Sequence, residues 1–67
     1  MRLFIDADRT AYEPEQVYET MTLGELIEHL SVLESDFGED TLVYLRHDGG
    51  YSYGGITGAN INIEEER

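Results

Sequence analysis

The chain has 67 residues, a length that fits one small domain. Fifteen Asp and Glu stand against four Arg and no Lys, which gives a formal net charge of −11. Such a negative surface excludes binding to nucleic acid or anionic membranes through a basic patch, and it attracts basic surfaces instead.

Residue types and patterns that the sequence lacks exclude further kinds of site. The chain holds no Cys, so it has no disulfide and no thiolate metal site. It has no apolar run long enough for a membrane span, and its N-terminus lacks the cleavage pattern of a signal peptide. A hydrophobic content of 40% favours a folded chain over an acidic disordered one. We therefore expect a cytoplasmic protein in which residues 1–67 form a single compact acidic domain, with no metal and no other cofactor.

The N-terminal part of the chain is expected to be extended. Residues 2–6 (RLFID) predict a first strand, because Leu3 and Ile5 fall on one face of an alternating pattern. Pro14 marks the loop that follows. Residues 16–20 (QVYET) have enough β-branched and aromatic character for a second short strand, and the alternative is an extended lead into the next helix.

The strongest signal in the sequence is a helix over residues 22–38. Thr22 and Glu25 have the spacing of a capping box, in which each side chain bonds the backbone amide of the other residue. Gly38 is the expected stop, because glycine readily adopts the left-handed conformation that ends many helices. The apolar residues have the i, i+3, i+4 spacing of one buried stripe: Leu23, Leu26, Ile27, Leu30, Leu33 and Phe37.

The other side of this helix carries the candidate binding residues. Glu25, Glu28 and Asp36 fall on one face with no Lys or Arg among them, although mixed charges would stabilise a merely solvated face. Val32 is the odd apolar residue on that face. A plain solvated face is the alternative interpretation. The predicted partner-binding residues are Glu25, Glu28, Val32, Asp36, Glu39 and Asp40.

The C-terminal half predicts a β-hairpin and a further strand. Residues 41–47 (TLVYLRH) alternate as a strand, residues 48–50 (DGG) predict the turn, and residues 51–53 begin the return strand. Residues 56–63 carry another alternating apolar set. The expected architecture is an α+β fold in the order β-(β)-α-β-β-β, with one amphipathic helix packed on a small, mostly antiparallel sheet.

The segment LFIDADRT contains the best candidate for a catalytic motif. Asp6, Asp8 and Thr10 follow an apolar strand, and this arrangement resembles the first motif of haloacid dehalogenase-type phosphatases. The resemblance implies a nucleophilic first Asp, an acid–base second Asp and a nearby Mg²⁺. The Lys with which that family holds phosphate has no counterpart, and the chain is too short for the family's doubly wound domain. Because the serines also lack a catalytic context, we expect a protein that is not an enzyme.

In size, charge and the pattern TLGELIEHL…DTLVYLRHDGG, the chain resembles the small phage-encoded anti-CRISPR inhibitors of the acidic, DNA-mimicking type. The resemblance implies an inhibitor that binds a cationic nucleic-acid-binding surface and blocks DNA binding by a CRISPR effector complex. It also implies a phage protein in the host cytoplasm, which binds that basic protein and not nucleic acid or membrane. The protein itself is expected to be a monomer or a weak homodimer.

Two other interpretations stay open from the sequence. The acidic excess and the missing Lys also fit a housekeeping or interaction domain of a halophile or its virus, where the charge is a surface adaptation and no mimicry is involved. The second interpretation is a fragment of a magnesium-dependent phosphatase that uses Asp6. Folding at low ionic strength separates mimicry from halophilic adaptation, because a halophilic domain unfolds when salt no longer screens its charges.

Overall fold

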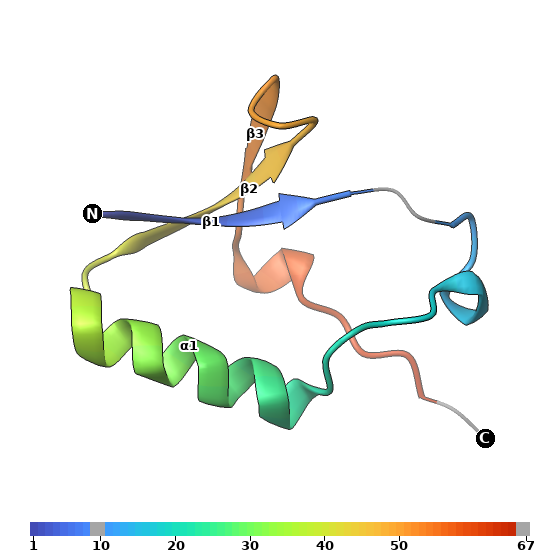
Figure 1. The fold of residues 1–67 in the computed structure, drawn as a ribbon, viewed down its shortest axis with the longest axis horizontal. Helices are drawn as coiled ribbons and strands as arrows, with labels where there is room; N and C mark the ends of the chain where they lie inside the picture. Colours follow the sequence, from blue (N-terminus) through green and yellow to red (C-terminus); the bar gives the residue numbers. More distant parts are fainter. Residues whose placement is uncertain (9–10, 66–67) are drawn as a thin grey trace.

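The described part of the chain contains one long helix, three strands and two short 3₁₀ turns. The computed structural model describes residues 1–8 and 11–65. Along the described chain the elements are β1 (Arg2–Ala7), η1 (Pro14–Gln16), α1 (Leu23–Phe37), β2 (Leu42–His47), β3 (Ser52–Gly55) and η2 (Gly58–Asn60), as Figure 1 shows. The α+β class and the order β-α-β-β are confirmed.

The sheet is mixed and has the strand order β1-β2-β3. Strand β1 pairs in parallel with β2, from Arg2 opposite Leu42 to Ala7 opposite His47. Strand β2 pairs antiparallel with β3, with Tyr44 opposite Gly55. The prediction of a mostly antiparallel sheet is therefore wrong. A helix between two strands returns the chain to the starting edge, and this favours parallel pairing of the strands that it connects.

The sequence predicts strands at residues 16–20 and 56–63, and neither segment forms one. Residues 17–22 have no regular structure, and Val17 and Thr22 have extended backbones, so the lead-in alternative is the correct one. The strand predicted for residues 56–63 is wrong, because η2 occupies its centre. There the Asn60 Oδ1 atom accepts bonds from Thr57, from the amide nitrogen at 2.9 Å and from the hydroxyl at 3.1 Å. This local cap competes with strand pairing.

The hairpin between β2 and β3 confirms the turn that the sequence predicts. Asp48, Gly49 and Gly50 have φ angles of 51°, 66° and 107°, all in the positive range that glycine tolerates best. The amide of Tyr51 donates to the carbonyl of His47 at 3.1 Å and closes the turn. This turn sets the register of the hairpin.

Helix α1 lies over one face of the sheet, but the two layers stay open (Figure 1). No residue in the described part of the chain is fully buried. The accessible surface is 6674 Å², whereas a closely packed protein of this mass exposes about 4,300 Å². The radius of gyration is 13.6 Å, against about 11 Å for a compact domain of this length. Much apolar surface is therefore left without protein contacts.

Candidate functional site

The acidic face of α1, meaning Glu25, Glu28 and Asp36, is built on a helix with a well-formed N-terminus. The hydroxyl oxygen of Thr22 accepts from the amide of Glu25 at 3.2 Å. The carboxylate of Glu25 accepts from the amide of Thr22 at 3.3 Å and from its hydroxyl at 3.0 Å. The capping box predicted from the sequence is present, so Glu25 has a structural role as well as a charge.

The C-terminus of α1 places the last acidic residues of the candidate site. Gly38 has a φ of 99°, and its amide donates to the carbonyl of Glu34 at 2.8 Å. The hydroxyl of Thr41 donates to the carbonyl of Phe37 at 3.2 Å. These bonds end the helix and turn the chain toward β2, so Glu39 and Asp40 lie in the short exposed connection between α1 and β2.

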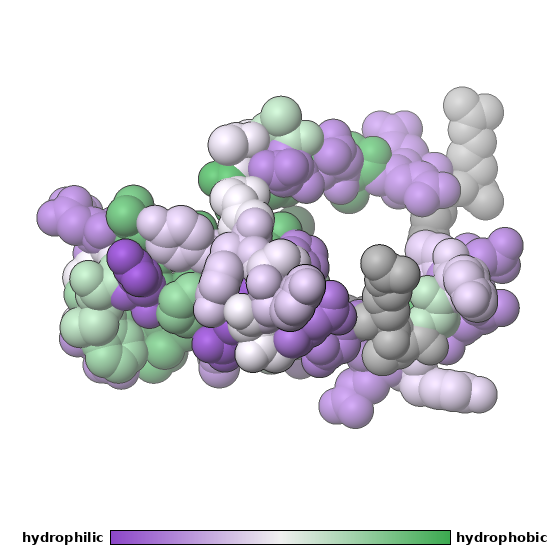
Figure 2. Space-filling model, turned by 90° about the horizontal axis from the view of Figure 1, so that it is seen from above, coloured by the Kyte–Doolittle hydropathy of each residue, from purple (hydrophilic) through white to green (hydrophobic). Residues whose placement is uncertain are grey.

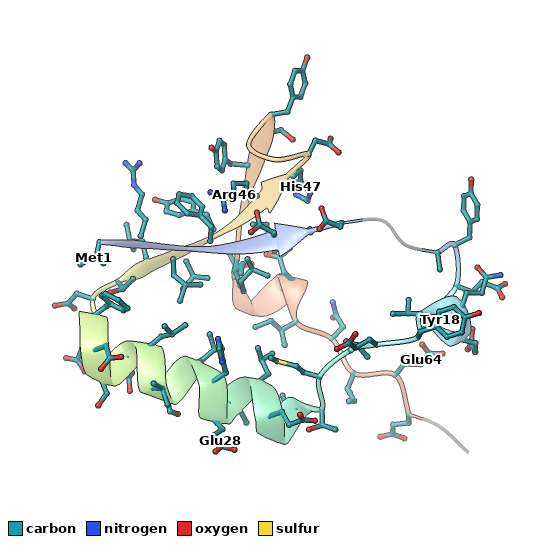
Figure 3. The ribbon with its side chains drawn as sticks, viewed as in Figure 1. Met1, Tyr18, Glu28, Arg46, His47 and Glu64 are labelled. Carbon is teal, nitrogen blue, oxygen red and sulfur yellow. The ribbon has the colours of Figure 1, made fainter. Side chains whose placement is uncertain are left out.

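The helix brings four of the six predicted residues onto one side. At about 100° per residue, Glu25, Glu28, Val32 and Asp36 fall within roughly 80° of one another around α1. All four are exposed, and the exposed fraction of Val32 is 57%. The side chain of Glu28 points away from the sheet (Figure 3). The acidic face is thus open to a partner, whereas the apolar stripe is on the sheet side.

Positive charge is scarce around this face. The sequence holds no Lys or Arg between Arg9 and Arg46, which includes all of α1. Every acidic side chain in the described part of the chain is exposed. In the described residues the ion pair is between Arg46 and Asp6, on neighbouring strands of the sheet. The acidic face of α1 therefore projects its charge into solvent without an internal counter-ion.

The pair between Asp6 and Arg46 anchors a cluster on the sheet face opposite α1. Arg46 donates through Nε to Asp6 Oδ1 at 2.6 Å and through Nη2 to Asp6 Oδ2 at 3.1 Å. These hydrogen bonds, with the positive charge, hold the pKa of Asp6 below its usual value, against a smaller opposing effect of desolvation. Asp6 in turn raises the pKa of Arg46. Figure 3 labels Arg46 among these strands.

Aromatic rings complete this cluster, which sequence reasoning did not assemble. The guanidinium carbon of Arg46 lies 4.7 Å from the centre of the Phe4 ring. The Phe4 ring centre is 6.1 Å from that of Tyr44 and 5.7 Å from that of Tyr53. Alternation in residues 2–6 places Phe4 and Asp6 on one face, but only the parallel register with β2 puts them beside Tyr44 and Arg46. The cluster joins all three strands and so stabilises the sheet.

Asp6 and Asp8, two residues of the phosphatase-like motif, lie in different surroundings. Both carboxylate oxygens of Asp6 are bound by Arg46, whereas Asp8 lines a shallow hollow with His47 and Asp48. Thr10, the third residue of the motif, lies outside the described residues. Within residues 1–8 and 11–65, no three His, Asp or Glu side chains are grouped so that they could hold a metal ion. The bidentate contact adds strength and geometric specificity to the pair between Asp6 and Arg46.

A groove opens between the inner side of α1 and the beginning of the sheet. It has a volume of about 390 Å³ and an apolar lining. The apolar side chains come from both layers: Met1, Leu3, Leu30, Leu33, Phe37 and Val43. Figure 2 shows apolar residues gathered at the end of the molecule where β1 begins and α1 ends. Glu39 borders this groove too, so one residue of the predicted binding set lies next to apolar surface.

Comparison with protein-family models, with characterised proteins and with solved structures gives no match for this chain. In the described part of the chain, no helix combines the length and the apolar character that are needed to cross a membrane. The surface of this small acidic α+β domain combines a strongly acidic helix face with an apolar groove.

Proposed function

We propose that the protein is a non-enzymatic inhibitor that acts in the host cytoplasm by occupying a cationic nucleic-acid-binding surface. The carboxylates of α1 and of the following turn take the positions that phosphates would occupy. The target is a basic DNA-binding protein, and a CRISPR effector complex is the target that the resemblance to acidic anti-CRISPR inhibitors favours. The nucleic-acid-binding surface of the target already holds Arg and Lys arranged for a polyanion. The inhibitor therefore needs a matching density of negative charge more than a particular shape.

The observation that carries the proposal is the density of uncompensated charge. A net charge of −11 is spread over a molecule whose longest dimension is 36 Å. This is about one net charge per 3.3 Å, the density of a single DNA strand at about 3.4 Å per phosphate and half that of the duplex. The acidic face of α1 alone is sparser, with three carboxylates along about 16 Å of helix axis. Glu39 and Asp40 extend that face beyond the helix.

The test compares two variants that lose the same charge from different places. The face variant carries Glu28→Gln, Asp36→Asn and Asp40→Asn, and it leaves the capping residue Glu25 intact. The control variant carries Glu13→Gln, Glu15→Gln and Glu19→Gln, which lie before α1. Both raise the net charge by three. Any difference between them therefore reports position and not total charge.

Binding is measured by capture of CRISPR effector complexes from the lysate of a CRISPR-bearing host, followed by competition with target DNA. The face variant should bind about tenfold more weakly than the wild type, since three surface contacts contribute about 0.5 kcal/mol each. Its affinity should also fall less steeply with salt. If the wild type binds no nucleic-acid-handling complex, or binds one without displacing DNA, the proposal is refuted. Equal losses in both variants would show that total charge, and not the acidic face of α1, determines binding.

A surface adapted to high salt is the second candidate function, because the same exposed carboxylates and missing Lys support it. In that case the domain is a halophilic housekeeping module, and its charge carries no information about partners. Circular dichroism during dialysis into a buffer of low ionic strength distinguishes the two. A mimic stays folded there, whereas a halophilic domain loses its helix signal because its self-repulsion is no longer screened.

A further inference from the structure

The apolar groove and the side of α1 next to it leave apolar side chains uncovered. The exposed fraction of Phe37 is 52%, and that of Val43 is 37%. On the same side of α1, Leu23 and Ile27 are exposed to 69% and 57% and continue the apolar surface along the helix. Contiguous apolar surface of this kind marks an interaction site in soluble proteins.

The excess accessible surface of the whole chain, which includes the extended segments before α1 and after η2 as well as the groove, is larger than the area that one partner of a stable dimer buries. The accessible surface of 6674 Å² exceeds that of a compact chain of this mass by about 2,400 Å². A standard interface covers about 800 Å² on each partner, and obligate homodimers cover more. Covering the groove and the adjacent helix stripe with a second copy would therefore use surface that the single chain leaves open, without unfolding any element.

Charge decides which side of the molecule two such copies can share. Two chains of net charge −11 repel each other, so they can meet only where carboxylates are few. The groove lining is mainly apolar, and its charged members are Arg2, Glu34 and Glu39, with a net charge of only −1. The acidic face of α1 lies on the far side of the helix, which is about 10 Å thick. With the grooves facing each other, the two acidic faces are separated by more than the screening length of about 8 Å at physiological salt.

We propose that the groove between α1 and the sheet is the interface of a symmetric homodimer, in which each copy covers the apolar stripe of the other. A two-fold axis brings the same surface of both copies together, so this one patch supplies both halves of the interface. The two acidic faces then point outward on opposite sides. Glu39 borders both this groove and the acidic face, but the other groove residues lie outside the proposed binding set. The dimer therefore holds whether or not the acidic face binds a DNA-binding protein.

The test is the mass and shape of the whole chain in solution. Analytical ultracentrifugation over a concentration series should show a species of twice the single-chain mass of 7.6 kDa. Its Kd should decrease as salt is raised, because salt screens the repulsion between like-charged copies. This sign is opposite to that expected for a complex with a basic partner. A wild type that stays at single-chain mass up to about 1 mM, or a dimer that weakens with salt, overturns the proposal.

A pair of substitutions locates the interface. Phe37→Gln changes a groove residue, and Val32→Gln changes a residue of similar exposure on the opposite side of α1. Phe37→Gln should raise the dimer Kd by at least about tenfold, as expected for a buried aromatic anchor, whereas Val32→Gln should change it less than about threefold. Circular dichroism checks that both variants keep the helix. Equal effects from both substitutions place the interface elsewhere and overturn the proposal.

X-ray scattering gives a second measurement that does not depend on the variants. A single chain with a radius of gyration near 11 Å would mean that α1 closes on the sheet and fills the groove itself. A single chain that keeps the open radius of 13.6 Å would mean that nothing covers the groove. Either result overturns the dimer, while a scattering mass of two chains supports it.

Discussion

The capping box at the start of α1 is expected to contribute a large part of the helix's stability. Because no residue in the described part of the chain is fully buried, α1 receives little support from a closed core and depends on local interactions. Thr22→Ala removes the acceptor for the amide of Glu25 at 3.2 Å and the donor to its carboxylate at 3.0 Å. We expect a loss of about 1 kcal/mol in the free energy of unfolding.

That loss corresponds to a decrease in Tm of about 4–8 °C for a domain of this size. Thermal unfolding followed by circular dichroism at 222 nm measures it, with urea unfolding as a second assay. Two matched variants separate the causes. Glu25→Gln keeps an oxygen that accepts from Thr22 but removes the charge, so its effect should stay within about 0.5 kcal/mol. Ser31→Ala removes a hydroxyl that bonds the carbonyl of Ile27 within the helix and should be neutral or slightly stabilising.

A Thr22→Ala variant as stable as the wild type would contradict this role of the capping box, because the two side-chain bonds would then contribute nothing. Equal losses for Thr22→Ala and Glu25→Gln would point instead to the carboxylate charge acting on the helix macrodipole. A loss for Ser31→Ala as large as that for Thr22→Ala would show that the helix responds to the removal of any hydroxyl.

Two further predictions concern the sheet and its hairpin. Asp6→Asn should lower stability at neutral pH, and the difference from the wild type should shrink as pH falls below about 4. The reason is that Arg46 lowers the pKa of folded Asp6, so ionised Asp6 stabilises the fold above its unfolded pKa and that contribution is lost as pH falls through the folded pKa. Urea unfolding at several pH values measures it, and a difference that does not change with pH would contradict it. Gly50→Ala should cost roughly 1–2 kcal/mol, because φ is 107° and the new Cβ would lie 3.3 Å from the Tyr53 hydroxyl. Gly55→Ala, whose Cβ would meet nothing within 4 Å, is the control, and equal Tm values for the two variants would contradict this account.

The candidate site shows which surface properties a sequence alone can predict. The 3.6-residue period of a helix assigns Glu28 and Asp36 to the side away from Leu30 and Leu33, and the structure places them there. The charge of Glu39 places it among the predicted partner-binding residues, yet this residue also borders the apolar groove. The groove itself could not be predicted, because it depends on how far α1 lies from the sheet, and no short segment of sequence encodes that distance.

The role of Asp6 could not be predicted from its sequence neighbours. Its sequence neighbours suggest a phosphatase nucleophile, whereas the fold binds both of its carboxylate oxygens to Arg46, forty positions along the chain. Alternation along β1 and β2 is the same for parallel and antiparallel pairing, because side chains alternate with period two in both. The sequence pattern therefore could not say that Asp6 and Arg46 lie opposite each other.

Features that depend on residues a few positions apart can be predicted from the sequence alone. These are the capping box of Thr22 and Glu25, the end of α1 at Gly38, the turn at residues 48–50 and the acidity of the outer helix face. Three other features depend on how distant segments pack: the parallel pairing of β1 with β2, the absence of a strand at residues 56–63 and the opening of the groove. The physical reason is range: caps and turns form within one or two turns of backbone, whereas strand partners and layer spacing are selected among distant segments that compete for the same edge and the same apolar face.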